Sequence, residues 1–141
     1  MARRVNVRVE IDAPIERVWR ALCDPAEVQA WDGAKPIDVP AGYPQPGQHA
    51  RWRVAVGPIG VVLHDRVSAV DAPQRLAARI TYAFVDIDEE YRLATHGGTT
   101  TVTSDNDVRS RPPGFGRLAA ALTRRSVQSA LERLAQHCSK P

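Results

Sequence analysis

The sequence has few cysteines, which cross-link many small proteins, and it lacks a long apolar segment of the kind that spans a membrane. Only two cysteines, Cys23 and Cys138, occur among 141 residues, and neither belongs to a Cys-x-x-Cys motif. We expect two buried, unreactive thiols, while a disulfide remains open because it needs Cα atoms within about 7 Å. The longest charge-free apolar stretch, residues 54–63, is interrupted by two glycines and a proline. A membrane span takes about 20 apolar residues, so we expect no integral membrane association.

Lysine is almost absent, so nearly all the positive charge is arginine. The 19 Lys and Arg residues against 16 Asp and Glu give a net charge of only +3. This small surplus is scattered, whereas nucleic-acid-binding proteins concentrate it on a stripe or a motif, so we expect no nucleic-acid partner. Residues 5–10, after two arginines, alternate in polarity and do not resemble the apolar part of a signal peptide. We therefore expect a cytoplasmic protein.

The composition is that of a globular domain, with 43% hydrophobic and 25% charged residues. A chain of this length buries roughly two-thirds of its unfolded surface and needs no metal or disulfide for stability. We expect one domain over residues 1–141.

The first third of the sequence predicts one strand and two short helices. Residues 3–11 alternate between polar and apolar and predict a half-buried strand. Residues 14–22 have helical spacing and follow a candidate N-cap at Asp12. Asp24 is a second N-cap, and it begins a short helix that ends near Trp31.

The rest predicts a run of strands and one long helix. Alternation and turn residues predict strands over 36–39, 48–56, 61–70, 76–84, 87–95 and 100–108. Residues 115–137 predict a long helix with an apolar stripe that includes Leu118 and Leu122. Successive antiparallel strands and one such helix favour an α+β fold, in which a curved sheet around the helix leaves an apolar cavity.

This order of elements, with the sequences of residues 9–22 and 24–27, resembles the SRPBCC superfamily of START-like and Bet v I-like proteins. Many bacterial members are labelled polyketide cyclase/dehydrase. The Gly-Gly-Thr-Thr turn at 97–100 and the closing helix are also similar to this family. The resemblance implies the helix-grip fold: a curved antiparallel sheet around a long C-terminal helix, with two short helices after the first strand. It also implies a cavity for a hydrophobic ligand, but no particular reaction.

Strand alternation predicts which side chains enter this cavity. If Trp52 points inward, the inward polar residues on later strands include Asp65, Glu89 and Asn106, although a one-residue slip would reverse any strand. The predicted ligand-binding residues are Trp31, Trp52, Val54, Leu63, Ile80, Asn106, Leu118 and Leu122.

Three of the inward polar residues are candidate catalytic groups. Burial would raise the pKa of Asp65, which suits a general acid or base. Tyr82 and Tyr91 could donate to a ligand carbonyl. The alternatives are an outward Asp65 paired with an arginine, which is the more common arrangement, and tyrosines that serve only the core.

The sequence predicts no metal and no cofactor. His49 and His64 would meet on the outer face of the sheet among arginines, without the three or four converging ligands of a zinc site. The acidic run 86–90 lacks the glycine and glutamate of a calcium loop.

Three functions fit these observations. The first is binding of a hydrophobic or aromatic small molecule, such as a lipid or polyketide, by a monomer or homodimer. The second is a polyketide cyclase or dehydratase that uses the cavity Asp and Tyr residues. The third is a protein-interaction module with a collapsed cavity.

Overall fold

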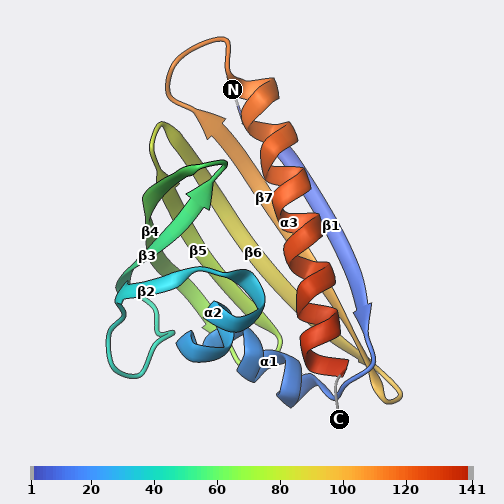
Figure 1. The fold of residues 1–141 in the computed structure, drawn as a ribbon. Helices are drawn as coiled ribbons and strands as arrows, with labels where there is room; N and C mark the ends of the chain where they lie inside the picture. The colour runs from blue at the N-terminus through green and yellow to red at the C-terminus, as the bar shows by residue number, and fades with distance from the viewer. Residues whose placement is uncertain (1, 140–141) are drawn as a thin grey trace.

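A computed structural model describes residues 2–139, in which a curved antiparallel sheet holds a long helix against its concave face (Figure 1). The seven strands lie in the order β1-β7-β6-β5-β4-β3-β2. The elements are β1 (Arg3–Ile11), α1 (Ile15–Cys23), α2 (Pro25–Asp32), β2 (Lys35–Asp38), β3 (His49–Val56), β4 (Ile59–Asp71), β5 (Arg75–Tyr82), β6 (Val85–His96), β7 (Thr99–Ser110) and α3 (Gly116–Ser139). This is the helix-grip fold that the sequence predicted.

Tight hairpins connect the successive strands from β3 to β7. Val56 pairs with Ile59 across the Gly57–Pro58 turn, so β4 begins two residues earlier than alternation predicted. Gly97 has a φ of 63°, a left-handed conformation that glycine adopts without strain, and it turns the chain from β6 into β7.

The two short helices begin in different ways. The Asp24 side chain accepts a hydrogen bond of 2.9 Å from the Ala26 backbone N–H and caps α2, as predicted. The predicted cap of α1 was wrong: the N-cap is Pro14, and no side chain caps this helix. The fixed φ of proline already suits the start of a helix, so α1 begins there without Asp12.

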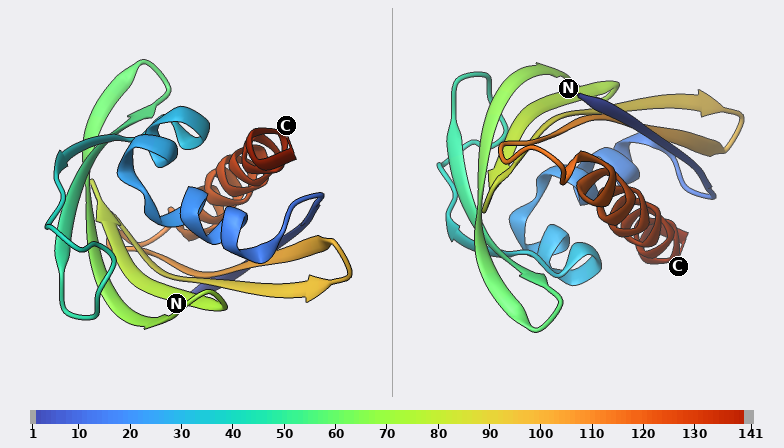
Figure 2. Two further views of the ribbon diagram at one scale, coloured as in Figure 1. Left: turned by 90° about the horizontal axis from the view of Figure 1, so that it is seen from below. Right: turned by 90° about the horizontal axis from the view of Figure 1, so that it is seen from above.

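The long helix covers only one part of the sheet. α3 packs on β1 and β7, where Leu131 and Leu134 are buried in one cluster with Ile11 and Val102. Strands β2 to β4 curl away from these contacts, around the side of the molecule that holds α1 and α2 (Figure 2). The main contacts of α3 are therefore with β1 and β7, and part of the concave face of β3 to β6 is left without close packing by this helix.

The apolar stripe of α3 lies one residue away from the predicted position at its N-terminal end. Leu118 and Leu122 are 55% and 49% exposed, whereas Ala119 and Thr123 are buried. Both pairs have the same four-residue spacing, so periodicity did not distinguish them. The structure packs Ala119 in a cluster with Val5, which places the leucines at the surface.

The sequence also predicted two buried thiols and no integral membrane association. Cys23 and Cys138 are both free and buried, and burial raises the pKa of Cys23 to about 12, so it stays a thiol. Within residues 2–139, no helix combines the length and apolarity that crossing a membrane requires.

Truncation on the two faces of α3 should have very different effects. Leu131→Ala should lower the free energy of unfolding by about 2–5 kcal/mol, because it leaves a cavity between α3 and the sheet. Leu122→Ala removes an exposed side chain and should cost less than about 1 kcal/mol. Urea unfolding measures both, and equal losses would contradict the orientation of the helix.

Candidate functional site

A pocket lies in the part of the concave face that α3 leaves uncovered. Its volume is about 390 Å³, it is partly open to solvent, and its walls come from β3 to β7, the end of α2 and one side of α3. This volume is within the range of small-molecule sites. The collapsed interior expected of a protein-interaction module is not found.

Most of the predicted site residues line this pocket. They are Trp31, Trp52, Val54, Leu63, Ile80 and Asn106 among the predicted ligand-binding residues, and Asp65, Tyr82 and Tyr91 among the predicted catalytic residues. Leu118 and Leu122 do not line it, because they are on the exposed side of α3. The indole N–H of Trp31 donates to the Ala21 carbonyl at 2.8 Å, which fixes this ring between the two short helices.

Asp65 of β4 points into the pocket and is only 5% exposed. Its Oδ2 accepts hydrogen bonds from the Tyr43 hydroxyl at 2.5 Å and the Trp52 indole N–H at 3.2 Å. Its Oδ1 is buried without a partner. Burial raises the pKa of Asp65, while the two hydrogen bonds oppose this effect.

The alternative of an outward Asp65 was wrong, although β4 does contain an irregularity. The register shift lies between Val67 and Ala69, beyond Asp65, so it does not change the direction of this side chain. Asp65 therefore keeps the inward alternation of Leu63.

A second carboxyl group of the pocket lies on β6. Glu89 of β6 pairs directly with Asn106 of β7, so both side chains are on the pocket face. Burial raises the pKa of Glu89 to about 8, and the negative charges of Asp65 and Asp32 add to this increase. Burial, followed by the nearby carboxylates, also raises the pKa of Tyr91.

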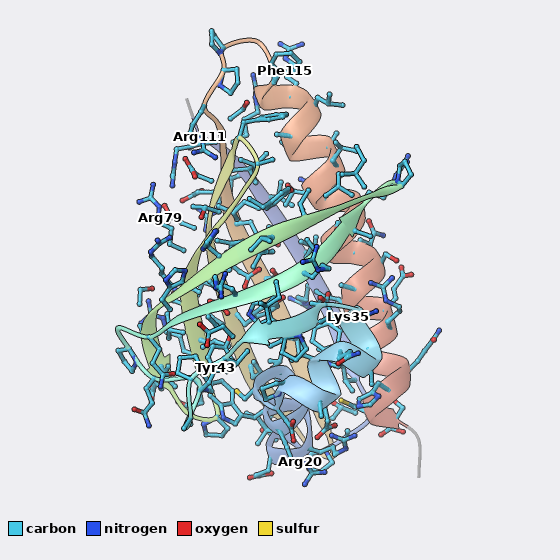
Figure 3. The ribbon with its side chains drawn as sticks, turned by 60° about the vertical axis from the view of Figure 1, so that its left-hand side comes forward. Arg20, Lys35, Tyr43, Arg79, Arg111 and Phe115 are labelled. Atoms are coloured by element: carbon cyan, nitrogen blue, oxygen red, sulfur yellow. The ribbon has the colours of Figure 1, made fainter. Side chains whose placement is uncertain are left out.

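Sequence reasoning missed several polar residues of the pocket, among them Tyr43, Asp32 and Arg133. Tyr43 comes from the Pro- and Gly-rich loop before β3 and lies in the half of the molecule that holds α1 and α2 (Figure 3). Asp32 ends α2 directly after Trp31, and Arg133 comes from α3. Arg133 Nε donates to the Trp31 carbonyl at 2.8 Å. Its charge opposes the increase that burial causes in the pKa of Asp32. Arg133 follows buried Ala130 by three residues, a signal that could have found it; the loop gave no such signal for Tyr43.

The outer face of the sheet carries charged side chains and is separate from the pocket. Arg79 points away from α3 there (Figure 3). The rings of His49 and His64 meet as predicted, with 2.9 Å between Nε2 and Nδ1. No group of three or more His, Cys, Asp or Glu side chains within residues 2–139 could hold a metal ion.

Comparison with known protein families shows to which family this chain belongs. The family described as polyketide cyclase/dehydrase and lipid transport matches residues 2–139. The chain belongs to this family. Its members share the SRPBCC fold, so the resemblance seen in the sequence is confirmed. No curated protein matches the chain.

Solved structures of similar fold come from several bacteria. CV1439 of Chromobacterium violaceum superposes with a TM-score of 0.83 at 15% identity, over 98% of each chain. A START superfamily protein of Mycobacterium smegmatis has a TM-score of 0.80 at 15% identity, over 96% of each chain. DynU16, from the dynemicin biosynthetic locus, has a TM-score of 0.74 at 25% identity over 95% of this chain. The aligned region covers only 46% of the length of DynU16.

The raised pKa of Glu89 predicts a stability that falls with pH. Glu89 is protonated in the folded protein up to about pH 8 but ionises near 4.5 once unfolded. Its contribution is therefore fully present below about pH 4.5 and is lost as pH rises to 8. Relative to the native protein, Glu89→Gln should gain about 2–4 kcal/mol between pH 5 and pH 8.5.

Urea unfolding at the two pH values measures this gain, and Glu90→Gln is the matched control. Arg75 and Arg92 lower the pKa of Glu90, so its contribution is lost only at acid pH. The control should show no relative gain between pH 5 and pH 8.5. A flat profile for Glu89→Gln would contradict a buried, protonated Glu89.

Proposed function

We propose that this protein binds an apolar or aromatic small molecule in the pocket between its sheet and α3. The observation that carries the proposal is the pocket itself, with a volume of about 390 Å³ and Trp52, Leu63 and Ile80 in its walls. Membership of a family described by polyketide chemistry and lipid transport supports this class of ligand. The origin of DynU16 in a biosynthetic locus supports a ligand from such chemistry.

The apolar walls can supply enough free energy for this binding. Burial of about 300–400 Å² of apolar ligand surface contributes roughly 8–10 kcal/mol at about 25 cal/mol per Å². The loss of translational and rotational freedom removes much of this gain, so we expect dissociation constants near micromolar.

Filling the pocket with a larger side chain should abolish binding. Val54 of β3 lines the pocket, whereas Val62 of β4 lies on the other face of the sheet. The neutral fluorophore 1-aminoanthracene should bind the native protein and Val62→Trp with similar affinity. It should bind Val54→Trp at least 10-fold more weakly, because the indole occupies the ligand volume.

Fluorescence enhancement of 1-aminoanthracene measures all three proteins, with circular dichroism to check folding. Absence of binding to the native protein, or equal binding by the two Trp variants, would overturn the proposed site.

A second function, proton transfer on a bound ketone, is favoured by the position of Asp65. This carboxyl group is inside the pocket with Oδ1 unpaired, and Tyr43 and Trp52 hold Oδ2 in place. A fixed carboxylate with a free oxygen can take a proton from a carbon next to a carbonyl, as cyclisation or dehydration of a polyketide requires. Tyr82 and Tyr91, on the same wall, would then donate to the carbonyl oxygen.

Deuterium exchange at the α-carbons of benzylacetone in D₂O tests this second function. The native protein should accelerate exchange, and Asp65→Asn should lose about 100-fold of the acceleration while it still binds 1-aminoanthracene. Asp88→Asn changes a carboxylate that pairs with Arg109 outside the pocket and should exchange at the native rate. Exchange by Asp65→Asn as fast as by the native protein would leave only the binding function.

A further inference from the structure

The pocket carries an excess of acidic side chains. Asp32, Asp65 and Glu89 line it, and Arg133 is the single basic side chain among the described residues of its walls. Arg133 is already engaged at the α2 side, where Nε donates to the Trp31 carbonyl and the terminal nitrogen donates to the Ser129 hydroxyl at 2.7 Å. Within residues 2–139, neither Asp65 nor Glu89 has an ion-pair partner. A cationic ligand would therefore complement these two carboxyl groups.

Two buried acceptors of the pocket have no donor. The Oδ1 atoms of Asp65 and Asn106 are both buried without a hydrogen-bond partner, in side chains that are 5% and 1% exposed. The Asn106 amide nitrogen donates to the Ser104 hydroxyl at 2.9 Å, which leaves its oxygen as the free group. A buried acceptor without a donor lowers the stability of the fold. A ligand that donates N–H bonds to these oxygens would recover this loss.

The two donors beside Asp65, by contrast, are occupied. The Tyr43 hydroxyl and the Trp52 indole N–H both donate to Oδ2 of Asp65. A carboxylate ligand at this end of the pocket would therefore find no free donor on these two side chains and would lie beside an acidic group. This arrangement disfavours a fatty acid that places its carboxylate there.

Aromatic rings surround the acidic groups. Tyr43 and Trp52 meet edge to face with 5.9 Å between ring centroids, and both donate to Asp65. Tyr91 neighbours Glu89 on β6, and all three rings line the pocket. Aromatic faces attract cations and also accommodate apolar chains. The same wall thus suits both ends of an amphipathic cation.

We propose that the ligand of this pocket is an amphipathic primary amine, whose ammonium group lies between Asp65, Glu89 and Asn106 and whose apolar body lies against Trp52, Leu63 and Ile80. This assignment rests on the proposed binding function. It narrows the ligand from an apolar small molecule of any charge to a positively charged one. Asp65 and Glu89 are two strands apart on the concave face, separated by Ile80 and Ala78 of β5. An ammonium group has three donors, so it can bind one of these carboxyl groups directly and reach the other through a bridging water. The raised pKa of Glu89 agrees with a carboxyl group that lacks a cation.

Three ligands with the same ten-carbon chain test the charge. Isothermal titration calorimetry at pH 8 should show that decylamine binds the native protein at least 10-fold more tightly than decanoate, with decanol between them. Equal or tighter binding of decanoate would overturn the inference. Because this comparison uses the native protein alone, it does not depend on the folding of any variant.

Variants then locate the charge preference. Asp65→Asn and Glu89→Gln should each reduce the ratio of decanoate to decylamine dissociation constants at least 5-fold, whereas Glu90→Gln, on the outer face, should leave it unchanged. An unchanged ratio in both pocket variants would also overturn the inference.

The same titrations separate this inference from the proposed function. If decanol and decanoate bind but decylamine does not, the pocket still binds apolar ligands and only the amine assignment fails. If none of the three ligands binds, both proposals fail.

Discussion

The packing of α3 on β1 and β7 is the contact on which the rest of this structure depends. Leu131 and Leu134 bury the helix against the strands at one edge of the sheet, and the sheet then curls away from it. The curvature leaves part of the concave face of β3 to β6 facing inward without close packing by α3. α2 and the loop that carries Tyr43 complete the enclosure, so a pocket forms where a flatter sheet would have packed solidly.

The carboxyl groups in this pocket are costly for the folded protein. Burial raises the pKa values of Asp65 and Glu89, which means that the empty fold disfavours their charged forms. Hydrophobic residues at these positions would avoid that cost. Such groups are concentrated at functional sites, where the chemistry of a ligand offsets their burial. The polar wall of the pocket therefore indicates its function better than the apolar wall does.

Much of the site could be predicted because strands alternate. Once Trp52 was placed inward, the period of two along each strand and the short hairpins between strands placed Asp65, Tyr82 and Asn106 on the same face. The prediction was weaker for α3, where the stripes of Leu118 and Ala119 differ by one residue. Periodicity could not place Tyr43 in the pocket, because a loop has no period that fixes the direction of its side chains.

The sequence by itself determined the elements, their order and the inward face of most strands, because local periodicity and turn residues act over a few positions. Only the tertiary structure decided that Tyr43 and Trp52 bind one oxygen of Asp65 and leave the other free. It also decided that Asp32 and Arg133 border the same pocket as Glu89. These groups are far apart along the chain, and the curvature of the sheet, which arises from the packing of all its strands and helices together, brings them to one place.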